Sequence, residues 1–197
     1  MNFQTVEFEA AAGRASQLPA STLPEVVFSG KSNVGKSSLL NKLVNRKALA
    51  RVSATPGKTA TINFYRLQQC RFVDLPGYGY AKVSQSEKAR WGELVEGYFA
   101  QERKIALVIQ LLDMRHKPTA DDQNMLQFLL DTGHPFAVVC TKCDKLNKSE
   151  TAAQTAYFQE LFAECQIPFT PFSAVKGTGL QEIQERIAQS VAALSEI

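Results

Sequence analysis

Long hydrophobic runs are missing from this sequence. No window of its 197 residues approaches the roughly 18 consecutive apolar residues that a membrane-spanning helix needs. The first twenty residues hold two acids and one arginine, without a basic segment followed by an apolar one, so they are not typical of a secretory signal peptide. We therefore expect a cytoplasmic protein with no membrane partner.

Cysteine and histidine are also scarce. The four cysteines are too few and too irregularly spaced for a disulfide framework in a chain of this length. Cys140 and Cys143 have the spacing of half a zinc or redox motif, but no second pair follows at ligand spacing. The two histidines, His116 and His134, are remote from that pair in sequence. We expect reduced thiols and no metal or redox centre built on cysteine.

Charge of one sign is not in large excess, since 22 Lys and Arg face 19 Asp and Glu, for a net charge of +3. The distribution is uneven: residues 1–120 carry 17 basic and 9 acidic side chains, whereas residues 121–197 carry 5 and 10. A basic region can meet a polyanion such as RNA, because clustered Lys and Arg displace phosphate counterions. A solvated face together with the lysines of a phosphate site would give the same asymmetry, and charge alone does not separate the two.

The order of apolar segments indicates an α/β fold. Short apolar runs alternate with segments of helical spacing, which is typical of a parallel sheet covered by helices on both faces. The expected strands are 26–28, 61–67, 70–73, 105–112, 136–139 and 167–172. The expected helices are 37–45, 85–100, 119–131, 149–165 and 180–194.

We expect one three-layer αβα domain over residues 24–197. Its six-stranded sheet is mostly parallel, and the strands 61–67 and 70–73 form one antiparallel edge hairpin. Two prolines restrict the strand 167–172 to an irregular or edge position. Residues 1–23 form an N-terminal extension, in which alternating Phe3, Val6 and Phe8 would add an edge strand.

One glycine-rich segment matches the phosphate-loop pattern of Gly, four residues and Gly-Lys-Ser. It spans residues 30–37, directly after an expected strand and at the start of an expected helix. Its glycines allow the backbone to wrap an anion, and N–H groups at the helix start point toward the phosphates. Lys36 would neutralise the β and γ oxygens, and Ser37 would coordinate Mg²⁺. The sequence therefore predicts a P-loop NTPase.

A second motif, residues 74–77 (Asp-Leu-Pro-Gly), follows the strand that ends at Val73. Asp74 lies at a strand tip, where it would bind Mg²⁺ through water, and the Gly77 N–H group can reach a terminal phosphate. Such a turn is common by itself. One hairpin downstream of a phosphate loop, it indicates a nucleotide site.

A third motif, residues 141–144 (Thr-Lys-Cys-Asp), follows the buried strand 136–139, where a purine base is expected at the carboxyl edge of the sheet. A carboxylate accepts two N–H bonds from guanine, and adenine offers neither donor there. Asp144 therefore predicts selectivity for guanine. The aliphatic part of the Lys142 side chain would lie along the plane of the base. Thr141 stands where asparagine is common in this motif.

Two further segments complete the expected site. Thr59, in the loop 46–60, is the expected second Mg²⁺ ligand that senses the γ-phosphate, although Thr55 and Thr61 compete for this role. Backbone N–H groups near Ala174, after the last expected strand, would contact the guanine oxygen.

Together these elements resemble a translation-factor-type small GTPase domain over about residues 25–197. More closely, the chain is similar to the EngB (YihA/YsxC) family of bacterial ribosome-biogenesis GTPases. The stretches that carry the likeness are 30–38, 55–65, 72–83 and 113–118, and the run Pro-Gly-Tyr-Gly-Tyr-Ala-Lys-Val within 76–83 is the most specific. The resemblance implies GTP and GDP binding, a magnesium ion and a part in assembly of the large ribosomal subunit, with its rRNA and ribosomal protein as partners.

The expected GTP-binding residues fall into four groups along the chain. They are Gly30, Lys31, Ser32, Asn33, Val34, Gly35, Lys36, Ser37 and Ser38; Gly57, Lys58, Thr59, Ala60 and Thr61; Asp74, Leu75, Pro76 and Gly77; and Thr141, Lys142, Cys143, Asp144, Phe172, Ser173 and Ala174. Lys36, Thr59 and Gly77 are expected to act in hydrolysis. Ser37, Thr59 and Asp74, the last through water, are expected to hold Mg²⁺.

Slow hydrolysis is expected because Tyr78 follows Gly77, where many GTPases have a glutamine that orients the attacking water. Asn33 offers one compensation, since similar GTPases use an asparagine here to coordinate K⁺ beside the phosphates. The alternative is that Asn33 only stabilises its own loop.

The loops 46–60 and 76–84 are the expected switches, which the γ-phosphate holds and hydrolysis releases. Basic and aromatic residues near them are the expected contact with RNA or a ribosomal partner, with the segment 113–118 as a further contributor. They are Lys58, Tyr78, Tyr80, Lys82, Lys88, Arg90 and Trp91, of which Trp91 is equally suited to the core.

Two other functions are considered. A P-loop phosphotransferase would use nucleotide only as a donor, but Asp144 and the two switch loops disfavour it, and no lid with paired arginines is evident. A membrane-associated GTPase lacks the expected lipidation motif or basic amphipathic terminus. We expect a monomer that acts as a nucleotide-dependent switch.

Overall fold

A computed structural model of the chain describes residues 1–46, 49, 60–79 and 84–195. Its seven-stranded sheet has the strand order β1-β3-β4-β2-β5-β6-β7. The strands are β1 (Glu7–Ala12), β2 (Glu25–Gly30), β3 (Ile62–Arg66), β4 (Arg71–Asp74), β5 (Ile105–Asp113), β6 (Phe136–Thr141) and β7 (Phe169–Pro171). The helices are α1 (Lys36–Leu43), α2 (Gln85–Phe99), α3 (Ala120–Thr132), α4 (Lys148–Ala163) and α5 (Leu180–Ser195), with the short 3-10 helices η1 (Ala15–Gln17) and η2 (Cys143–Lys145).

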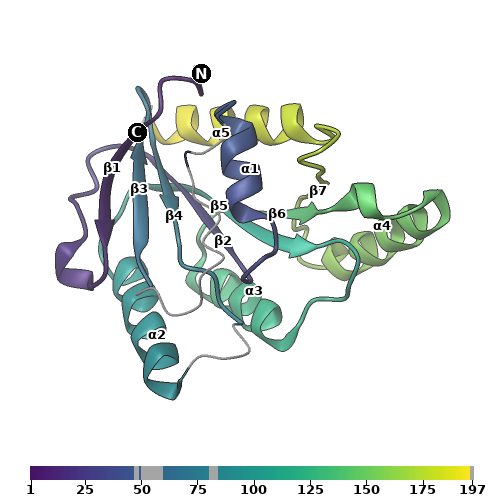
Figure 1. Cartoon of the computed structure of the whole chain (residues 1–197), viewed down its shortest axis with the longest axis horizontal. Helices are drawn as coiled ribbons and strands as arrows, with labels where there is room; N and C mark the ends of the chain where they lie inside the picture. Colours follow the sequence, from purple (N-terminus) through teal and green to yellow (C-terminus); the bar gives the residue numbers. More distant parts are fainter. Residues whose placement is uncertain (47–48, 50–59, 80–83, 196–197) are drawn as a thin grey trace.

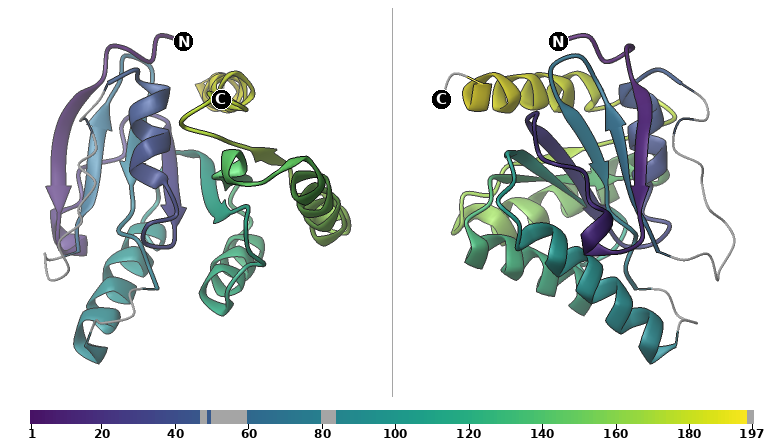
Figure 2. Two further views of the ribbon diagram at one scale, coloured as in Figure 1. Left: turned by 45° about the vertical axis from the view of Figure 1, so that its right-hand side comes forward. Right: turned by 90° about the vertical axis from the view of Figure 1, so that its left-hand side faces the viewer.

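The predicted three-layer arrangement is confirmed. Successive side chains of a strand point to opposite faces of the sheet, and every residue of β2 is buried. Val26 and Phe28 pack in one core with residues of α1 and α5, whereas Val27 packs in another with residues of α2 and α3. Figures 1 and 2 show α1 and α5 on one side of the sheet and α2 and α3 on the other.

The edge strand expected within residues 1–23 is present as β1, and it raises the number of strands in the sheet from the expected six to seven. β1 pairs antiparallel with β3, with an irregularity between Phe8 and Ala10, so the hairpin β3–β4 is not at the edge. The strand composition, Glu-Phe-Glu-Ala-Ala-Ala, is rich in residues that are depleted in strands, so the pattern predicted it only weakly. β1 occupies the backbone groups that β3 would otherwise expose.

The helix boundaries follow from local capping. The helices α2, α3 and α4 each begin with a capping box, formed by Ser84 with Glu87, Thr119 with Asp122, and Asn147 with Glu150. Each box satisfies backbone N–H groups that the first helical turn leaves unpaired. Within the described ranges, none of the helices is both long and apolar enough to cross a membrane.

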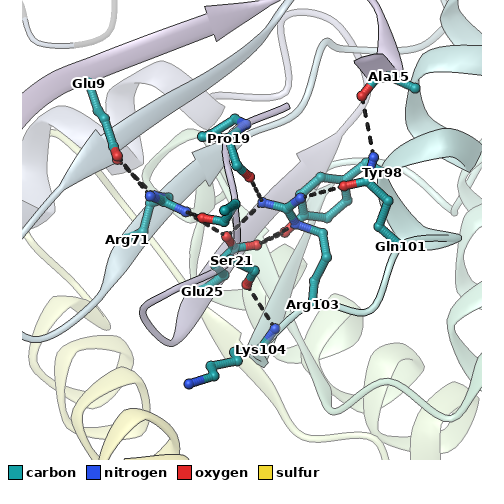
Figure 3. A network of polar contacts seen from close by, with 11 residues as sticks. Glu9, Ala15, Pro19, Ser21, Glu25, Arg71, Tyr98, Gln101, Arg103 and Lys104 are labelled. Atoms are coloured by element: carbon teal, nitrogen blue, oxygen red, sulfur yellow. Dashed lines mark hydrogen bonds and ion pairs between the residues drawn. The ribbon is translucent and has the colours of Figure 1, made fainter. Parts of the chain in front are cut away.

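A buried ionic network fixes the starts of the central strands (Figure 3). Glu25 opens β2 and is fully buried. Arg103 donates to both of its carboxylate oxygens at 2.8 Å, Arg71 donates to Oε1 at 3.0 Å, and the Tyr98 hydroxyl donates to Oε2 at 2.6 Å. Arg71 also makes two 2.7 Å bonds to Glu9 of β1. One carboxylate therefore joins β2, β4, α2 and the approach to β5.

The Glu25 carboxylate is kept ionised by these donors. Burial alone would raise its pKa, but the bonds from Arg103, Tyr98 and Arg71 outweigh burial and lower the pKa below its ordinary value of 4.5. The network therefore contributes stability at neutral pH that is lost as the pH falls through the folded-state pKa.

Glu25→Gln should destabilise the fold strongly. The substitution keeps the shape but removes the charge between Arg71 and Arg103, and breaking such a buried pair lowers the free energy of unfolding by about 3–5 kcal/mol. Urea unfolding followed by circular dichroism measures the change. Glu93→Gln, at an exposed position of α2, is the matched control and should change stability by less than about 0.5 kcal/mol. Equal effects of the two substitutions would contradict this role for Glu25.

Candidate functional site

The predicted motifs meet at one edge of the sheet. The strands β4, β2, β5, β6 and β7 run parallel, so their carboxyl ends lie on the same side. The three motifs begin where β2, β4 and β6 end. Crevices at this edge are where open α/β sheets bind ligands.

The phosphate loop links β2 to α1 as predicted. Gly35 is the N-cap of α1 and has φ +112°, a backbone conformation that glycine adopts much more readily than other residues. Asn33 also has a positive φ, of +61°. The first turn of α1, with Lys36 and Ser37, leaves backbone N–H groups without helical partners. The loop can therefore receive an anion at the start of α1.

Lys36 and Asp74 are brought together, although they are 38 positions apart in sequence. Lys36 Nζ donates to Asp74 Oδ1 in an ion pair whose side chains are nearly buried. Asp74 ends β4, and the next residue, Leu75, donates its N–H group to the Phe28 carbonyl at 3.0 Å. The lysine of the phosphate loop and the carboxylate of the second motif are therefore in direct contact.

The segment after Asp74 lies against the phosphate loop. The Ser32 N–H group donates to the Tyr78 carbonyl at 2.8 Å, and the Tyr78 N–H group donates to the Gly30 carbonyl at 3.4 Å. A Cβ atom on Gly77 would come within 3.1 Å of both the Cα and the N atoms of Ser32. This close approach favours glycine at position 77, because a Cβ atom there would force the Ser32 backbone to shift.

The Tyr78 side chain is buried, which corrects its expected place on a partner surface. Its hydroxyl donates to Asp122 Oδ1 at 2.7 Å and accepts from Gln110 Nε2 at 2.6 Å. Burial and the neighbouring Asp122 carboxylate raise the pKa of Tyr78 far above its ordinary value, so the phenol stays protonated. The ring contacts Trp91, whose indole N–H group donates to the Pro76 carbonyl at 2.8 Å. The buried Tyr78 ring is not available to stack on a base, whereas Trp91 is half-buried.

The third motif is anchored to the phosphate loop. Thr141 Oγ1 lies 2.6 Å from the Val34 carbonyl oxygen, so threonine supplies a loop contact where asparagine was the common residue. Lys142 Nζ donates to the Asn33 carbonyl at 2.8 Å and to Asp113 Oδ2 at 2.9 Å. The predicted base-binding segment and the phosphate loop are therefore one connected unit.

Asp144 is oriented by the neighbouring predicted segment. Ser173 is fully buried, and its hydroxyl donates to Asp144 Oδ1 at 2.7 Å and accepts from the Lys176 N–H group at 3.0 Å. The Cys143 N–H group donates to the Phe172 carbonyl at 3.2 Å, and the buried Phe172 packs in the core. These contacts hold the Asp144 carboxylate in one orientation at the carboxyl edge of the sheet.

Asp113 is a site residue that the sequence analysis placed only on an outer surface. It ends β5 and accepts from both Lys142 and Arg115, the latter through two side-chain bonds of 2.8 and 2.9 Å. Burial alone would raise the pKa of Asp113, but the bonds from Arg115 and Lys142 outweigh burial and hold it well below its usual range. Only the position of Asp113 at a strand end pointed to this role.

Some predicted residues cannot be located. Gly57, Lys58 and Thr59, together with Tyr80 and Lys82, lie outside the described residues. Ala60 and Thr61 precede β3, where Thr61 Oγ1 is 3.3 Å from Asn63 Oδ1. Lys88 and Arg90 are exposed on α2, as expected of a surface that meets a partner.

The oxygen atoms available near the phosphate loop fit a hard cation whose remaining ligands are phosphate oxygens and water. Ser37 and Asp74 offer oxygen atoms, which Mg²⁺ prefers over nitrogen and sulfur. Across residues 1–46, 49, 60–79 and 84–195, no three His, Cys, Asp or Glu side chains form a cluster that could hold a metal by themselves. A cation here would depend on a bound anion for most of its coordination.

Known proteins share both the sequence and the fold. The family described as 50S ribosome-binding GTPase matches residues 25–142. The "Probable GTP-binding protein EngB" of Lachnoclostridium phytofermentans is 44% identical over 191 residues, which cover 96% of this chain and 95% of that protein. The protein of the same name from Heliobacterium modesticaldum is 46% identical over 185 residues, or 93% and 90% of the two chains.

Two solved structures have a similar fold. One is the crystal structure of a probable GTP-binding protein EngB, with a TM-score of 0.69 and 24% identity over 86% of this chain and 99% of that one. The other is Era in complex with MgGDPNP and nucleotides 1506–1542 of 16S ribosomal RNA, with a TM-score of 0.63 and 22% identity over 87% and 57% of the two chains.

Proposed function

Because the chain belongs to the EngB family of GTP-binding proteins and is therefore a GTPase, we propose that the sheet edge described above is its guanine-nucleotide site. The observation that carries the proposal is the convergence of Lys36, Asp74 and Asp144 on that edge, with Lys142 bonded to the phosphate loop. These groups match the two ends of a nucleotide, a polyphosphate and a base.

The phosphate end would be held by the residues of the predicted loop. N–H groups of residues 33–38 would surround the phosphates, with Lys36 exchanging its Asp74 partner for phosphate oxygens. Gly77 would donate its N–H group to the γ-phosphate, and Thr59 would close over it. Ser37 and Asp74 would hold Mg²⁺, which, when bound, neutralises charge on the β and γ phosphates.

The base end would be read by Asp144. Its carboxylate would accept the N1–H and amino N–H groups of guanine, and Ser173 fixes its orientation before the base arrives. Lys142 would cover one face of the base, and the backbone near Ala174 would meet the guanine oxygen. Adenine has no donor at the matching positions, so ATP would bind poorly.

Hydrolysis by the protein alone would be slow. The Tyr78 hydroxyl is bonded to Asp122 and Gln110, so it is not available to orient water as a glutamine would. Among the described residues, the Asn33 side chain is exposed and has no hydrogen-bond partner, so it is available to a K⁺ ion beside the phosphates.

We further propose that the protein is a switch in assembly of the large ribosomal subunit. The support is the family description, which names 50S ribosome binding, together with exposed Lys88 and Arg90 on α2 next to the second switch. Lysine and arginine at this position suit the phosphates of rRNA.

Asp144→Ala should abolish guanine recognition. We expect the affinities for GDP and GTP to fall by at least about 100-fold, since two hydrogen bonds to one charged group are lost. Isothermal titration calorimetry measures these affinities, and Asp131→Ala, at an exposed position of α3, is the control. Asp144→Asn should prefer xanthine nucleotides, because its amide N–H group suits the extra carbonyl of xanthine. Unchanged GDP affinity in Asp144→Ala, or a preference for ATP, would reject the guanine-site assignment.

Hydrolysis should be faster in potassium than in sodium buffer if Asn33 holds K⁺. Phosphate release under multiple turnover measures the rates, and Asn33→Ala should remove the difference between the two salts. Asn124→Ala, an exposed asparagine of α3, should retain it. A potassium effect that survives in Asn33→Ala would show that this side chain is not the ligand.

The nucleotide should control ribosome binding. In sucrose-cushion sedimentation with isolated subunits, we expect the protein to pellet with large subunits in one nucleotide state and to stay in the supernatant in the other. Lys88→Glu should weaken pelleting and reduce its salt dependence, whereas Lys104→Glu, at the far end of the sheet, should not. Equal pelleting with GDP and a GTP analogue would contradict a switch.

A further inference from the structure

The backbone of Gly77 and Tyr78 occupies donors that a third phosphate would use. The Ser32 N–H group belongs to the phosphate loop, yet it donates to the Tyr78 carbonyl at 2.8 Å. Gly77 lies so close to Ser32 that a Cβ atom at position 77 would come within 3.1 Å of the Ser32 backbone, tighter than an ordinary van der Waals contact. This places a carbonyl, which repels anions, where the loop faces the end of the polyphosphate.

A nucleoside diphosphate and a triphosphate would respond differently to this contact. The N–H groups of residues 35–38 are not used by the Gly77–Tyr78 segment, so they are available to the phosphates that both nucleotides share. The γ-phosphate needs space beside Ser32 and the Gly77 N–H group, and this space is available only after the segment leaves the loop. The Lys36–Asp74 pair must open for either nucleotide and does not distinguish them.

The Tyr78 side chain holds the segment in this position. Its hydroxyl bonds to Asp122 and Gln110 at 2.7 and 2.6 Å in a buried site, and its ring packs edge-on against Trp91. Asp122 is itself fixed, because its other oxygen accepts from the N–H and hydroxyl groups of Thr119 in the cap of α3. Moving the backbone off Ser32 therefore strains or breaks a buried bond to a charged group.

We propose that Tyr78 and Asp122 determine the preference of this GTPase for GDP over GTP, by holding the Gly77–Tyr78 backbone in the space of the γ-phosphate. Both are positioning residues, since neither touches the nucleotide. The inference rests on the proposed function, which places the γ-phosphate next to Gly77. It assigns to Tyr78 a role in ligand discrimination, in the position where other GTPases have a residue for hydrolysis.

The contact also links the nucleotide to two helices. Asp122 caps α3 and Trp91 belongs to α2, so displacement of the segment by a γ-phosphate changes the partners of both. The same bonds that select GDP thus connect the phosphate end of the site to the outer helices.

Tyr78→Phe tests the proposal with the smallest change. It removes the hydroxyl and keeps the ring against Trp91. We expect the ratio of the dissociation constants for a non-hydrolysable GTP analogue and for GDP to fall by about fivefold, the effect of one buried hydrogen bond, with GDP affinity unchanged. Calorimetric titration of the full chain with each nucleotide gives the ratio.

Tyr98→Phe is the matched control. It also removes a buried tyrosine hydroxyl that is bonded to a carboxylate, at 2.6 Å from Glu25, but at the opposite end of the sheet. We expect it to lower the free energy of unfolding without changing the nucleotide ratio. A loss of stability alone therefore does not imitate the effect expected of Tyr78→Phe.

Asp122→Asn is the second variant, and it weakens the acceptor of the same bond. It should shift the ratio in the same direction. The double substitution should add little to either single substitution, because both remove the same interaction.

The fluorescence of Trp91 gives an independent measurement. Trp91 is the sole tryptophan of the chain and bonds to the Pro76 carbonyl, so its emission reports on the segment directly. The wild type should give different emission spectra with the GTP analogue and with GDP.

The outcomes separate the two levels of the argument. An unchanged ratio in a Tyr78→Phe protein that binds GDP normally overturns this inference alone, as does an equal loss of affinity for both nucleotides. A wild-type chain that binds neither nucleotide overturns the proposed function and this inference with it.

Discussion

The parallel register of the central strands depends on the buried carboxylate of Glu25. This one group forms ion pairs with Arg71 at the start of β4, which Glu9 also pairs, and with Arg103 just before β5, so the three strands begin at the same level. A strand rises about 3.3 Å per residue, and alignment at one end therefore sets the level of the other end. Gly30, Asp74 and Asp113 come to lie at one edge because the network at the opposite edge leaves the strands no freedom to slide.

The site is thus built from strand ends, and its details depend on close backbone contacts. The phosphate loop turns back at Gly35, and Gly77 packs so closely against Ser32 that a side chain there would be accommodated only if the backbone shifted. Polar side chains then join the parts: Thr141 and Lys142 bond to carbonyl groups of the loop, and Ser173 bonds to Asp144. Under the proposed function, a nucleotide would meet an Asp144 carboxylate that Ser173 already orients, and a phosphate end in which Lys36 is paired with Asp74 and the Ser32 N–H group with Tyr78.

Sequence reasoning succeeded where chemistry and position are both local. The phosphate loop, the acid of the second motif and Asp144 each follow an apolar strand, so their meeting at one edge was predictable. Capping pairs such as Ser84 with Glu87 likewise mark helix starts. Contacts between distant segments were not predictable: the bond from Tyr78 to Asp122 spans 44 positions. The edge strand expected within residues 1–23 is present as β1, but its pairing with β3 was not predicted. Tyr78 was assigned to a surface, and Trp91 was left open between surface and core, because aromatic residues near a basic loop fit a base-stacking site as well as they fit a core.

The substitution of tyrosine for glutamine after Gly77 changes what this position can do. A glutamine there is exposed to the reacting water, whereas the Tyr78 hydroxyl is buried between β5 and the start of α3. The segment that would sense the γ-phosphate is therefore bonded to α3 and β5 through Tyr78. Under the proposed function, slow hydrolysis and a mechanically coupled switch follow from the same side chain. If the chain acts as the proposed assembly switch, it would keep its nucleotide state until a cation or a partner completes the site from outside.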